Sequence, residues 1–365
     1  MQYGKTLKKL LILLLIPFGL LLVFISSRNP ASVESIYSAV LYPPIGRLLS
    51  GVTGIFPFSL AEIIVFSVPV AFISYTVVFL VRLTAERNGR LLIFLKYITA
   101  LSVLISITFF SFIGIWGLNY YRMPFASIAG LDVQPASLPE LESLCSDLIQ
   151  KANSLRASVS VDSKGYMDIP GSSRDILDNC YKGYDAIAGH YPELSGKYGN
   201  PKPVLLSALM NYTGICGIYF PFTGEANVNV SIPDSMLPST TAHEMAHQRG
   251  FSREDEANYI SYLACSNHPD VNYRYSGVLL ALIHSMNALY SSDEEAAVKL
   301  AEGYSEGLRK DLDQNNAFWK QYEGPVEDAT DRMNNTYLKA NNQKDGVQSY
   351  GRMVDLLIAE HRKNK

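Results

Sequence analysis

Three long apolar stretches constrain this chain more than any other feature of its sequence. A helix of about 20 apolar residues crosses the hydrocarbon core of a bilayer. The stretches cover about residues 10–27, 60–81 and 97–120, and each is long enough to cross. The third ends near Trp116 and Tyr120, and aromatic side chains of this kind gather at the membrane–water boundary. We therefore predict three transmembrane helices.

The first stretch has a second interpretation, a signal peptide that is cleaved after export, because a basic start and an apolar core suit both. No clear small-residue cleavage site follows Ile25, and two further apolar stretches come after it. These observations favour an anchor that stays in the protein.

Basic residues around the stretches predict their orientation, because Lys and Arg concentrate on the cytoplasmic side. Three lysines precede the first stretch and four basic residues separate the second from the third, whereas residues 28–59 carry only Arg28 and Arg47. We therefore predict a multi-pass protein of the cell membrane with a cytoplasmic N-terminus. Residues 1–121 form its membrane region in the lipid bilayer, and residues 122–365 form an extracytoplasmic domain.

Charge and cysteine content add two further expectations. The formal net charge is −3, and this near balance gives no reason to expect nucleic acid as a partner. An even number of cysteines in an oxidising compartment permits disulfides, and buried free thiols are the equal alternative. All four lie in the predicted outer domain, at Cys145, Cys180, Cys216 and Cys265.

One short motif in the outer domain indicates metal chemistry. Residues 241–250 read Thr-Ala-His-Glu-Met-Ala-His-Gln-Arg-Gly and contain H-E-x-x-H, flanked by helix start and stop signals. Residues four apart share a helix face, so His243 and His247 can bind one zinc ion while Glu244 acts as general base for a metal-activated water. The alternative is a solvated helix with Glu244 as a cap. It is disfavoured because two of only six histidines fall at this spacing.

Zinc needs a third protein ligand, and the sequence offers Glu254 or Glu256. The metzincin pattern H-E-x-x-H-x-x-G-x-x-H fails, because its last position holds Arg253 and a guanidinium cannot bind zinc. Residues 254–258, Glu-Asp-Glu-Ala-Asn, resemble the E-x-x-x-D pattern in which gluzincins supply a glutamate from a second helix. The resemblance favours Glu254 as ligand, with Asn258 supporting a ligating histidine from the position of the usual Asp.

Residues 243–265 and the preceding YFPFTGEANVNV together resemble an uncharacterised bacterial family of multi-pass membrane proteins with a gluzincin-like metallopeptidase domain. The resemblance covers most of the chain. It implies a zincin-like α+β domain, mostly helical with a small sheet, after three transmembrane helices. It also implies that the strand before the active-site helix is an edge strand that binds substrate by strand addition, with Asn227 and Asn229 on one face. A plain edge strand with solvated asparagines is the equal alternative.

The leading functional hypothesis is a membrane-anchored zinc metalloendopeptidase that hydrolyses a peptide or protein substrate with Glu244 as general base. The alternative is a non-catalytic zinc-binding sensor or recognition domain, against which Glu244 argues because a pure binding site needs no base. An intramembrane protease is disfavoured, because charged residues surround the motif. Nothing in the sequence selects the group that would stabilise the oxyanion among Tyr273, Tyr275, His284 and Tyr350.

Overall fold

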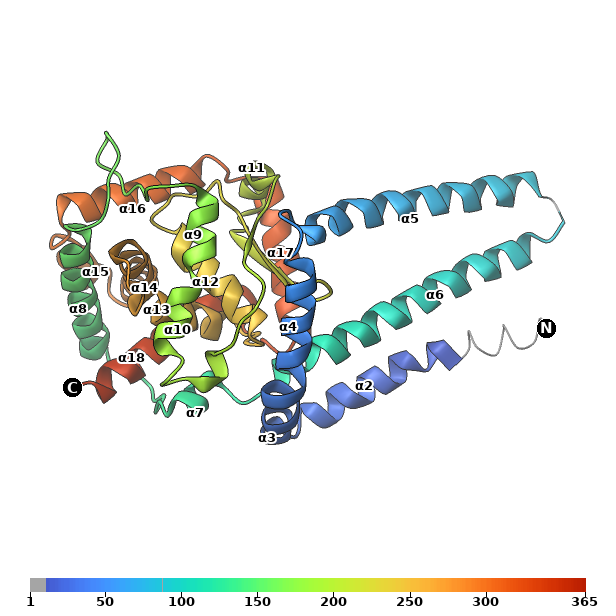
Figure 1. Cartoon of the computed structure of the whole chain (residues 1–365), viewed down its shortest axis with the longest axis horizontal. Helices are drawn as coiled ribbons and strands as arrows, with labels where there is room; N and C mark the ends of the chain where they lie inside the picture. Colours follow the sequence, from blue (N-terminus) through green and yellow to red (C-terminus); the bar gives the residue numbers. More distant parts are fainter. Residues whose placement is uncertain (1–10, 87) are drawn as a thin grey trace.

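Long apolar helices leave one side of a larger, mostly helical domain, which we call the outer domain after its predicted location (Figure 1). The computed structural model describes residues 11–86 and 88–365, without the side chains of residues 349 and 350. The apolar helices are α2 (Leu15–Ser26), α5 (Leu60–Ala85) and α6 (Arg90–Ile115). Helices α5 and α6 are each long and apolar enough to cross a membrane, and α2 qualifies together with the segment after a 105° bend. The described chain thus has two candidate membrane helices, or three if the bent pair is one span.

The predicted spans agree with these helices, but their bounds differ. Helix α6 begins at Arg90, well before the predicted start at residue 97. Lys96 does not end it, because a long basic side chain near a helix end can extend to the membrane surface. Residue 10, the lysines before it and Arg87 lie outside the described residues, so the orientation rests on the sequence.

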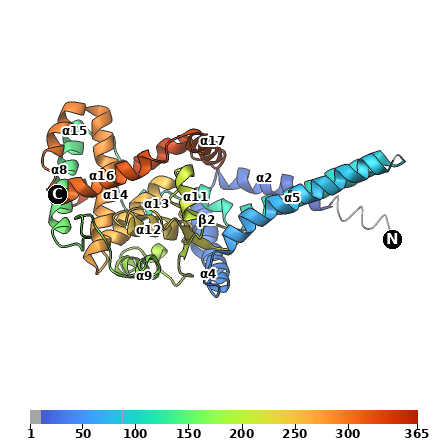
Figure 2. The same cartoon turned by 90° about the horizontal axis from the view of Figure 1, so that it is seen from above.

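The apolar helices share one direction relative to the outer domain. The connection between α5 and α6 lies at the end remote from that domain in both views (Figures 1 and 2). Near this connection Tyr97 of α6 stacks on Phe79 of α5, with ring centroids 4.0 Å apart. The outer domain therefore lies at one end of the α5–α6 hairpin.

The segment between α2 and α5 packs against the outer domain. It forms α3 (Pro30–Ser32), the π-helix η1 (Val33–Leu41) and α4 (Tyr42–Thr53). Tyr42 is fully buried, and its hydroxyl donates to the Gln248 carbonyl at 2.9 Å. The outer domain therefore includes this segment in addition to the predicted residues 122–365. Hydropathy alone could not show this, because the segment is itself largely apolar.

The rest of the outer domain contains many short elements. In chain order these are η2 (Gly117–Tyr121), α7 (Phe125–Ala129), α8 (Leu138–Arg156), α9 (Ser173–Asn179), α10 (Tyr181–Ile187), η3 (Pro192–Leu194), β1 (Lys202–Pro203), α11 (Ser207–Met210), η4 (Asn211–Thr213), β2 (Gly217–Phe220), β3 (Glu225–Val228), α12 (Leu237–Gln248), α13 (Glu254–Ser266), α14 (Val271–Ser292), α15 (Glu294–Ala301), α16 (Glu306–Lys320), α17 (Pro325–Ala340), η5 (Gly346–Arg352) and α18 (Met353–Lys363). Helix α13 contacts both α12 and α14, and α8 packs against α14 and α18. These helices bury the main apolar core, which includes Leu148, Leu263 and Leu279.

The cysteines contribute to this core as thiols. All four are free, and Cys145, Cys180 and Cys265 are buried. Of the two alternatives left by the sequence, the structure contains the unpaired one.

The small sheet corrects the prediction of an edge strand at Asn227 and Asn229. Its order is β1-β3-β2, so β3, which carries Asn227, is the central strand. Lys202 and Pro203 of β1 pair in parallel with Asn227 and Val228 and occupy the expected free edge. Strand β1 consists of only Lys202 and Pro203, which is too short to show hydrophobic alternation. The sequence therefore did not reveal this strand.

Both asparagines are buried and bonded within the protein. Asn227 Oδ1 accepts a hydrogen bond from the Ser59 hydroxyl at 2.6 Å, and Asn229 Nδ2 donates to Asn211 Oδ1 at 2.7 Å. Their side chains therefore hold the sheet to its surroundings and do not face a substrate.

A buried ion pair joins this sheet to the start of α5. Lys202 Nζ lies 3.0 Å from Glu225 Oε1, with both side chains almost fully buried. The same ammonium donates to the carbonyls of Thr53, Phe56 and Phe58, and Glu225 accepts from the backbone N–H groups that begin α5. The start of the candidate membrane helix α5 and the sheet are thus connected through this pair of charges.

Replacing Lys202 with Met is expected to lower the free energy of unfolding by about 3–5 kcal/mol, because it leaves a buried carboxylate without its cation. The thermal unfolding midpoint of the detergent-purified protein measures this. Lys310→Met is the matched control, since Lys310 pairs with Glu306 at 2.9 Å on the surface, where such pairs contribute little. Equal midpoints for the two variants would contradict the role given to Lys202.

Candidate metal centre

Helix α12 and the start of α13 supply the candidate metal ligands. Pro238 lies in the first turn of α12, where its missing N–H costs no helical hydrogen bond. The chain reverses after α12 through Gly250, whose φ of +86° favours glycine. A Cβ at this position would also come within 2.8 Å of the Tyr42 ring. The tight reversal brings Glu254, at the start of α13, back to the histidines of α12.

Three side chains converge at this reversal. His243 Nε2 lies 3.1 Å from Glu254 Oε2, and His247 Nε2 lies 3.5 Å from the same oxygen. The two imidazole rings stand nearly perpendicular, with centroids 4.7 Å apart. One ligand atom from each of the three residues lies within 4.8 Å of the others. His243, His247 and Glu254, which we call the metal group, are therefore arranged so that they can hold one ion.

Hydrogen bonds on the far side of each ring orient the histidines. His243 Nδ1 lies 2.8 Å from Asn258 Oδ1, and His247 Nδ1 lies 2.7 Å from the Phe251 carbonyl. A carbonyl oxygen only accepts, so Nδ1 is assigned as the donor in both rings. Each Nε2 then faces the centre, which is the orientation that metal-binding histidines adopt.

Asn258 occupies the supporting position that the sequence predicts for it. Asn258→Ala is expected to weaken zinc affinity by about 10–100-fold, because it frees the ring of His243 without removing a ligand. Competition with a chromophoric zinc chelator measures the change. Unchanged affinity would show that Asn258 has no part in orienting the ring.

The ionisation of the metal group favours a cation at its centre. Burial alone would raise the pKa of Glu254, yet the adjacent His247 and His243 hold that pKa well below its usual range. Burial alone would lower the pKa of His247, yet Glu254 raises it to about 9. The proton on His247 thus balances the Glu254 carboxylate. A metal ion would replace that proton.

Glu244 lies next to the metal group and is buried. Burial raises its pKa, against the opposing charges of His243 and His247. Among the described residues its Oε2 has no hydrogen-bond partner. Strand β2 passes close by, and a Cβ on Gly217 would come within 2.5 Å of Glu244 Oε1. The carboxylate is therefore held between α12 and the edge strand.

Glu256, the alternative ligand, points elsewhere. Its Oε1 accepts a hydrogen bond from the Phe125 backbone N–H at 2.9 Å and lies 3.5 Å from Arg253 Nη1. The structure thus brings Glu254, and not Glu256, to the two histidines.

The comparison with protein families can now be set beside this geometry. A family model described as "Protein of unknown function (DUF3810)" matches residues 37–358. The chain belongs to this family. The match covers α5, α6 and the whole metal group, and the description assigns no activity. No curated protein and no solved structure matches the chain.

Contacts at the end of α12 were missed by the sequence analysis. The indole N–H of Trp116 donates to the His247 carbonyl at 3.3 Å, and Arg122 Nη1 donates to the Gly250 carbonyl at 3.1 Å. The Gln343 side chain accepts from the Glu254 backbone N–H at 3.2 Å. These partners are about 90 to 130 residues away in the sequence, and no local pattern marks them.

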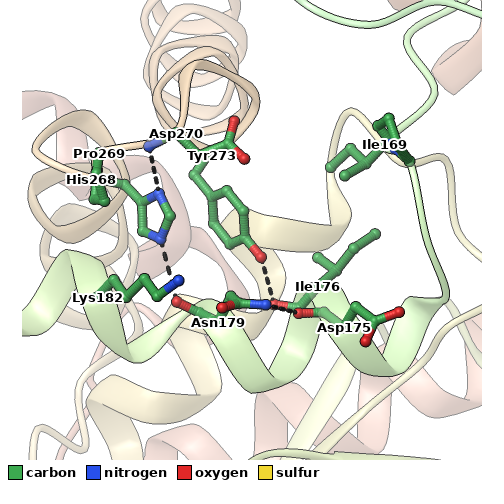
Figure 3. A pocket seen from close by; sticks show the side chains of 10 residues that line it. Ile169, Asp175, Ile176, Asn179, Lys182, His268, Pro269, Asp270 and Tyr273 are labelled. Carbon is green, nitrogen blue, oxygen red and sulfur yellow. Dashed lines mark hydrogen bonds between the residues drawn. The ribbon is translucent and has the colours of Figure 1, made fainter.

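A surface hollow, shown in Figure 3, has none of the metal group among its lining residues. Two of the residues that line it, His268 and Tyr273, could on their residue type have been part of a catalytic site. His268 is held by Asn179 and Asp270 through both ring nitrogens, so it offers no free ligand atom. The Tyr273 hydroxyl donates to the Ile176 carbonyl at 2.6 Å (Figure 3). Both residues are therefore structural.

The remaining candidates for oxyanion stabilisation divide clearly. The Tyr275 hydroxyl donates to Asp311 at 2.8 Å, and the side chain of Tyr350 lies outside the described residues. Of the candidates whose side chains the structure describes, His284 is the one on which the charge of the metal group acts: burial, together with the charge of His243, lowers its pKa to about 4. His284 is thus neutral near neutral pH.

Proposed function

We propose that this protein is a membrane-anchored zinc metallopeptidase with a zincin-like outer domain. One observation carries the proposal: the metal group converges from two helices while the Glu244 carboxylate lies buried beside it. A structural cluster would not need this carboxylate. Within the part of the chain that the structure describes, Glu244 Oε2 is a buried polar atom without a hydrogen-bond partner, which proteins normally avoid outside functional sites.

The chemistry of the donor set supports zinc. Two imidazole nitrogens and one carboxylate oxygen are a ligand set of catalytic zinc sites, which keep a fourth position open. When bound, zinc supplies Lewis acidity, which polarises a carbonyl and lowers the pKa of water. Asn258 and the Phe251 carbonyl hold the two rings in place for this purpose.

Glu244 is the proposed general base. Its raised pKa makes the carboxylate a better proton acceptor than a solvated glutamate. It takes a proton from the attacking water and delivers it to the amine nitrogen as the peptide bond breaks. His284 is the candidate donor to the oxyanion, because it is the neutral side chain that interacts with His243.

Strand β2 replaces the asparagine-bearing strand as the proposed substrate edge. It forms one edge of the sheet, and its first residue, Gly217, lies against Glu244. A peptide paired with this edge by strand addition would pass close to the general base. The close approach also explains why a residue without a side chain begins the strand.

The zincin-like fold and the orientation belong to the same proposal. Helix α12 packs against β2 and β3, and it also contacts α13, whose first residue Glu254 reaches His243. This order of sheet, metal-binding helix and second helix supports a zincin-like fold. The basic residues near the apolar stretches support an extracytoplasmic outer domain.

A non-catalytic zinc sensor is the second candidate, and one observation favours it. Trp116, at the end of a candidate membrane helix, bonds directly to the backbone of the ligand His247. Metal binding could then be transmitted to the membrane region. Such a sensor would have no use for Glu244.

Turnover of peptides tests the proposal. The zinc-loaded protein in detergent is expected to cut internal bonds in a mixture of random peptides, read by mass spectrometry. 1,10-Phenanthroline should stop the cleavage, and added zinc should restore it. Peptides that stay intact with the loaded protein would contradict the proposed activity.

A further inference from the structure

The metal-binding helix is attached to the outer ends of the membrane helices. Trp116 directly follows Ile115, the last residue of α6. Its indole N–H donates to the His247 carbonyl, and its ring lies edge-on to the His247 ring with centroids 6.3 Å apart. His247 therefore lies at the level where α6 leaves the apolar layer.

The sheet is attached in the same way to α5. Glu225 of β3 accepts hydrogen bonds from the N–H groups of Leu60 and Ala61 in the first turn of α5. In return, the carboxylate of Glu62 on α5 accepts from the N–H groups of Leu205 and Leu206. The metal-binding helix α12 and the sheet that carries the proposed substrate edge are thus each hydrogen-bonded to an end of a candidate membrane helix.

Apolar side chains are exposed on segments that adjoin the start of α5: Leu205 is bonded to it, α11 and η4 follow in the chain, and α17 contacts η4. Helices α11 and α17 lie near the start of α5 in both views (Figures 1 and 2). We call the exposed apolar set the collar, and it comprises Ile55, Leu205, Leu209, Tyr212, Val326 and Met333. Leu205 is 76% exposed although it is bonded to the first turn of α5. The collar continues into α5, whose apolar stretch is not buried by the protein, and this continuity makes lipid the occupant of the collar.

The substrate edge lies at the same depth. The ring of Tyr219 on β2 contacts the ring of Trp116, with centroids 5.4 Å apart. A peptide paired with β2 would therefore lie close to the membrane surface. An extended chain covers about 3.3 Å per residue, so a chain anchored in the bilayer reaches this strand with only a few residues.

We propose that the substrate is a polypeptide anchored in the same membrane and cut a few residues from its anchor. This inference rests on the proposed peptidase function. Anchoring raises the effective concentration of the substrate at a site that the collar holds against the bilayer. A soluble folded protein, in contrast, would have to bring an extended segment down to the headgroups.

Cleavage in vesicles tests the substrate class. The full-length zinc-loaded protein is reconstituted in phosphatidylcholine–phosphatidylglycerol vesicles with a randomised peptide library in three forms. One form is free, and the others are joined to a single-span leucine helix through a short or a long Gly-Ser spacer. The short-spacer form is expected to be cut about 100-fold faster than the free form, as the gain in effective concentration predicts. Glu244→Gln in the same vesicles controls for contaminating proteases.

The outcomes separate the two proposals. A free library cut as fast as the short-spacer form would overturn this inference and leave the peptidase function standing. Faster cleavage of the long-spacer form than of the short-spacer form would likewise overturn this inference and leave the peptidase function standing. No cleavage in any form would overturn both.

A second measurement needs no catalysis. The chain has two tryptophans, so Trp319→Phe leaves Trp116 as the only one. Its fluorescence is expected to be quenched most by lipids that carry a nitroxide near the headgroup, and less by a label near the chain end. Fluorescence that none of these lipids quenches would overturn the placement of the site at the membrane surface.

Discussion

Replacing Glu244 with glutamine lowers peptide hydrolysis by about 10²–10⁴-fold, the range that a positioned general base contributes, while zinc stays bound. Glutamine has the shape of glutamate but cannot take a proton. It also leaves His243, His247 and Glu254 untouched, so the ligand set is complete. The measurement is kcat on any peptide that the wild-type protein cuts, together with the zinc content of both proteins.

The two readouts of this variant distinguish the candidate functions. Full turnover by Glu244→Gln would remove Glu244 from the mechanism and with it the main argument for a peptidase. Loss of zinc from the variant would mean that the carboxylate has a structural part in the site. Retained zinc with lost turnover is the result that a non-catalytic sensor cannot produce, because it has no turnover to lose.

Glu254→Gln is the second variant with a large expected effect. It replaces a carboxylate that lies 3.1 Å from His243 Nε2 and 3.5 Å from His247 Nε2. Zinc affinity should fall by more than the roughly 10–100-fold that loss of a supporting hydrogen bond costs, because the change removes a charged ligand. Isothermal titration or chelator competition measures the affinity.

Glu256→Gln is the matched control for that variant. Glu256 lies two residues away on the same helix, and burial raises its pKa to about 7. A neutral glutamine can still accept the hydrogen bond from the Phe125 backbone N–H. Zinc affinity should therefore stay at the wild-type value. A larger loss in Glu256→Gln than in Glu254→Gln would reverse the assignment of the third candidate ligand.

The local parts of the site were predictable because they depend on helix geometry. His243 and His247 are four residues apart, so they share a face of α12. Glu244 is next to His243 in the sequence and therefore lies close to the same site. The resemblance to gluzincins favoured Glu254 as the third ligand, and the structure adds the chain reversal at Gly250 that brings it to the histidines. These residues lie close together both in the sequence and in the structure.

The parts that depend on distant segments were not predictable. The pairing of β1 with β3 makes β3 central, and a two-residue strand has no periodic pattern to show this. Trp116 was predicted from its type to lie at a membrane boundary. Its bond to the His247 carbonyl joins segments that only the tertiary fold brings together. The contribution of residues 30–59 to the outer domain was hidden for the same reason.

The central claim is that His243, His247 and Glu254 hold one zinc ion. Metal analysis of the purified full-length protein, wild type against His243→Ala, tests it most directly. His268→Ala is the control, because that buried histidine lies in the hollow of Figure 3 and outside the metal group. We predict about one equivalent of zinc in the wild type and in His268→Ala, as three protein ligands provide, and its loss in His243→Ala. No zinc in the wild type after loading, or equal zinc in wild type and His243→Ala, would contradict the claim.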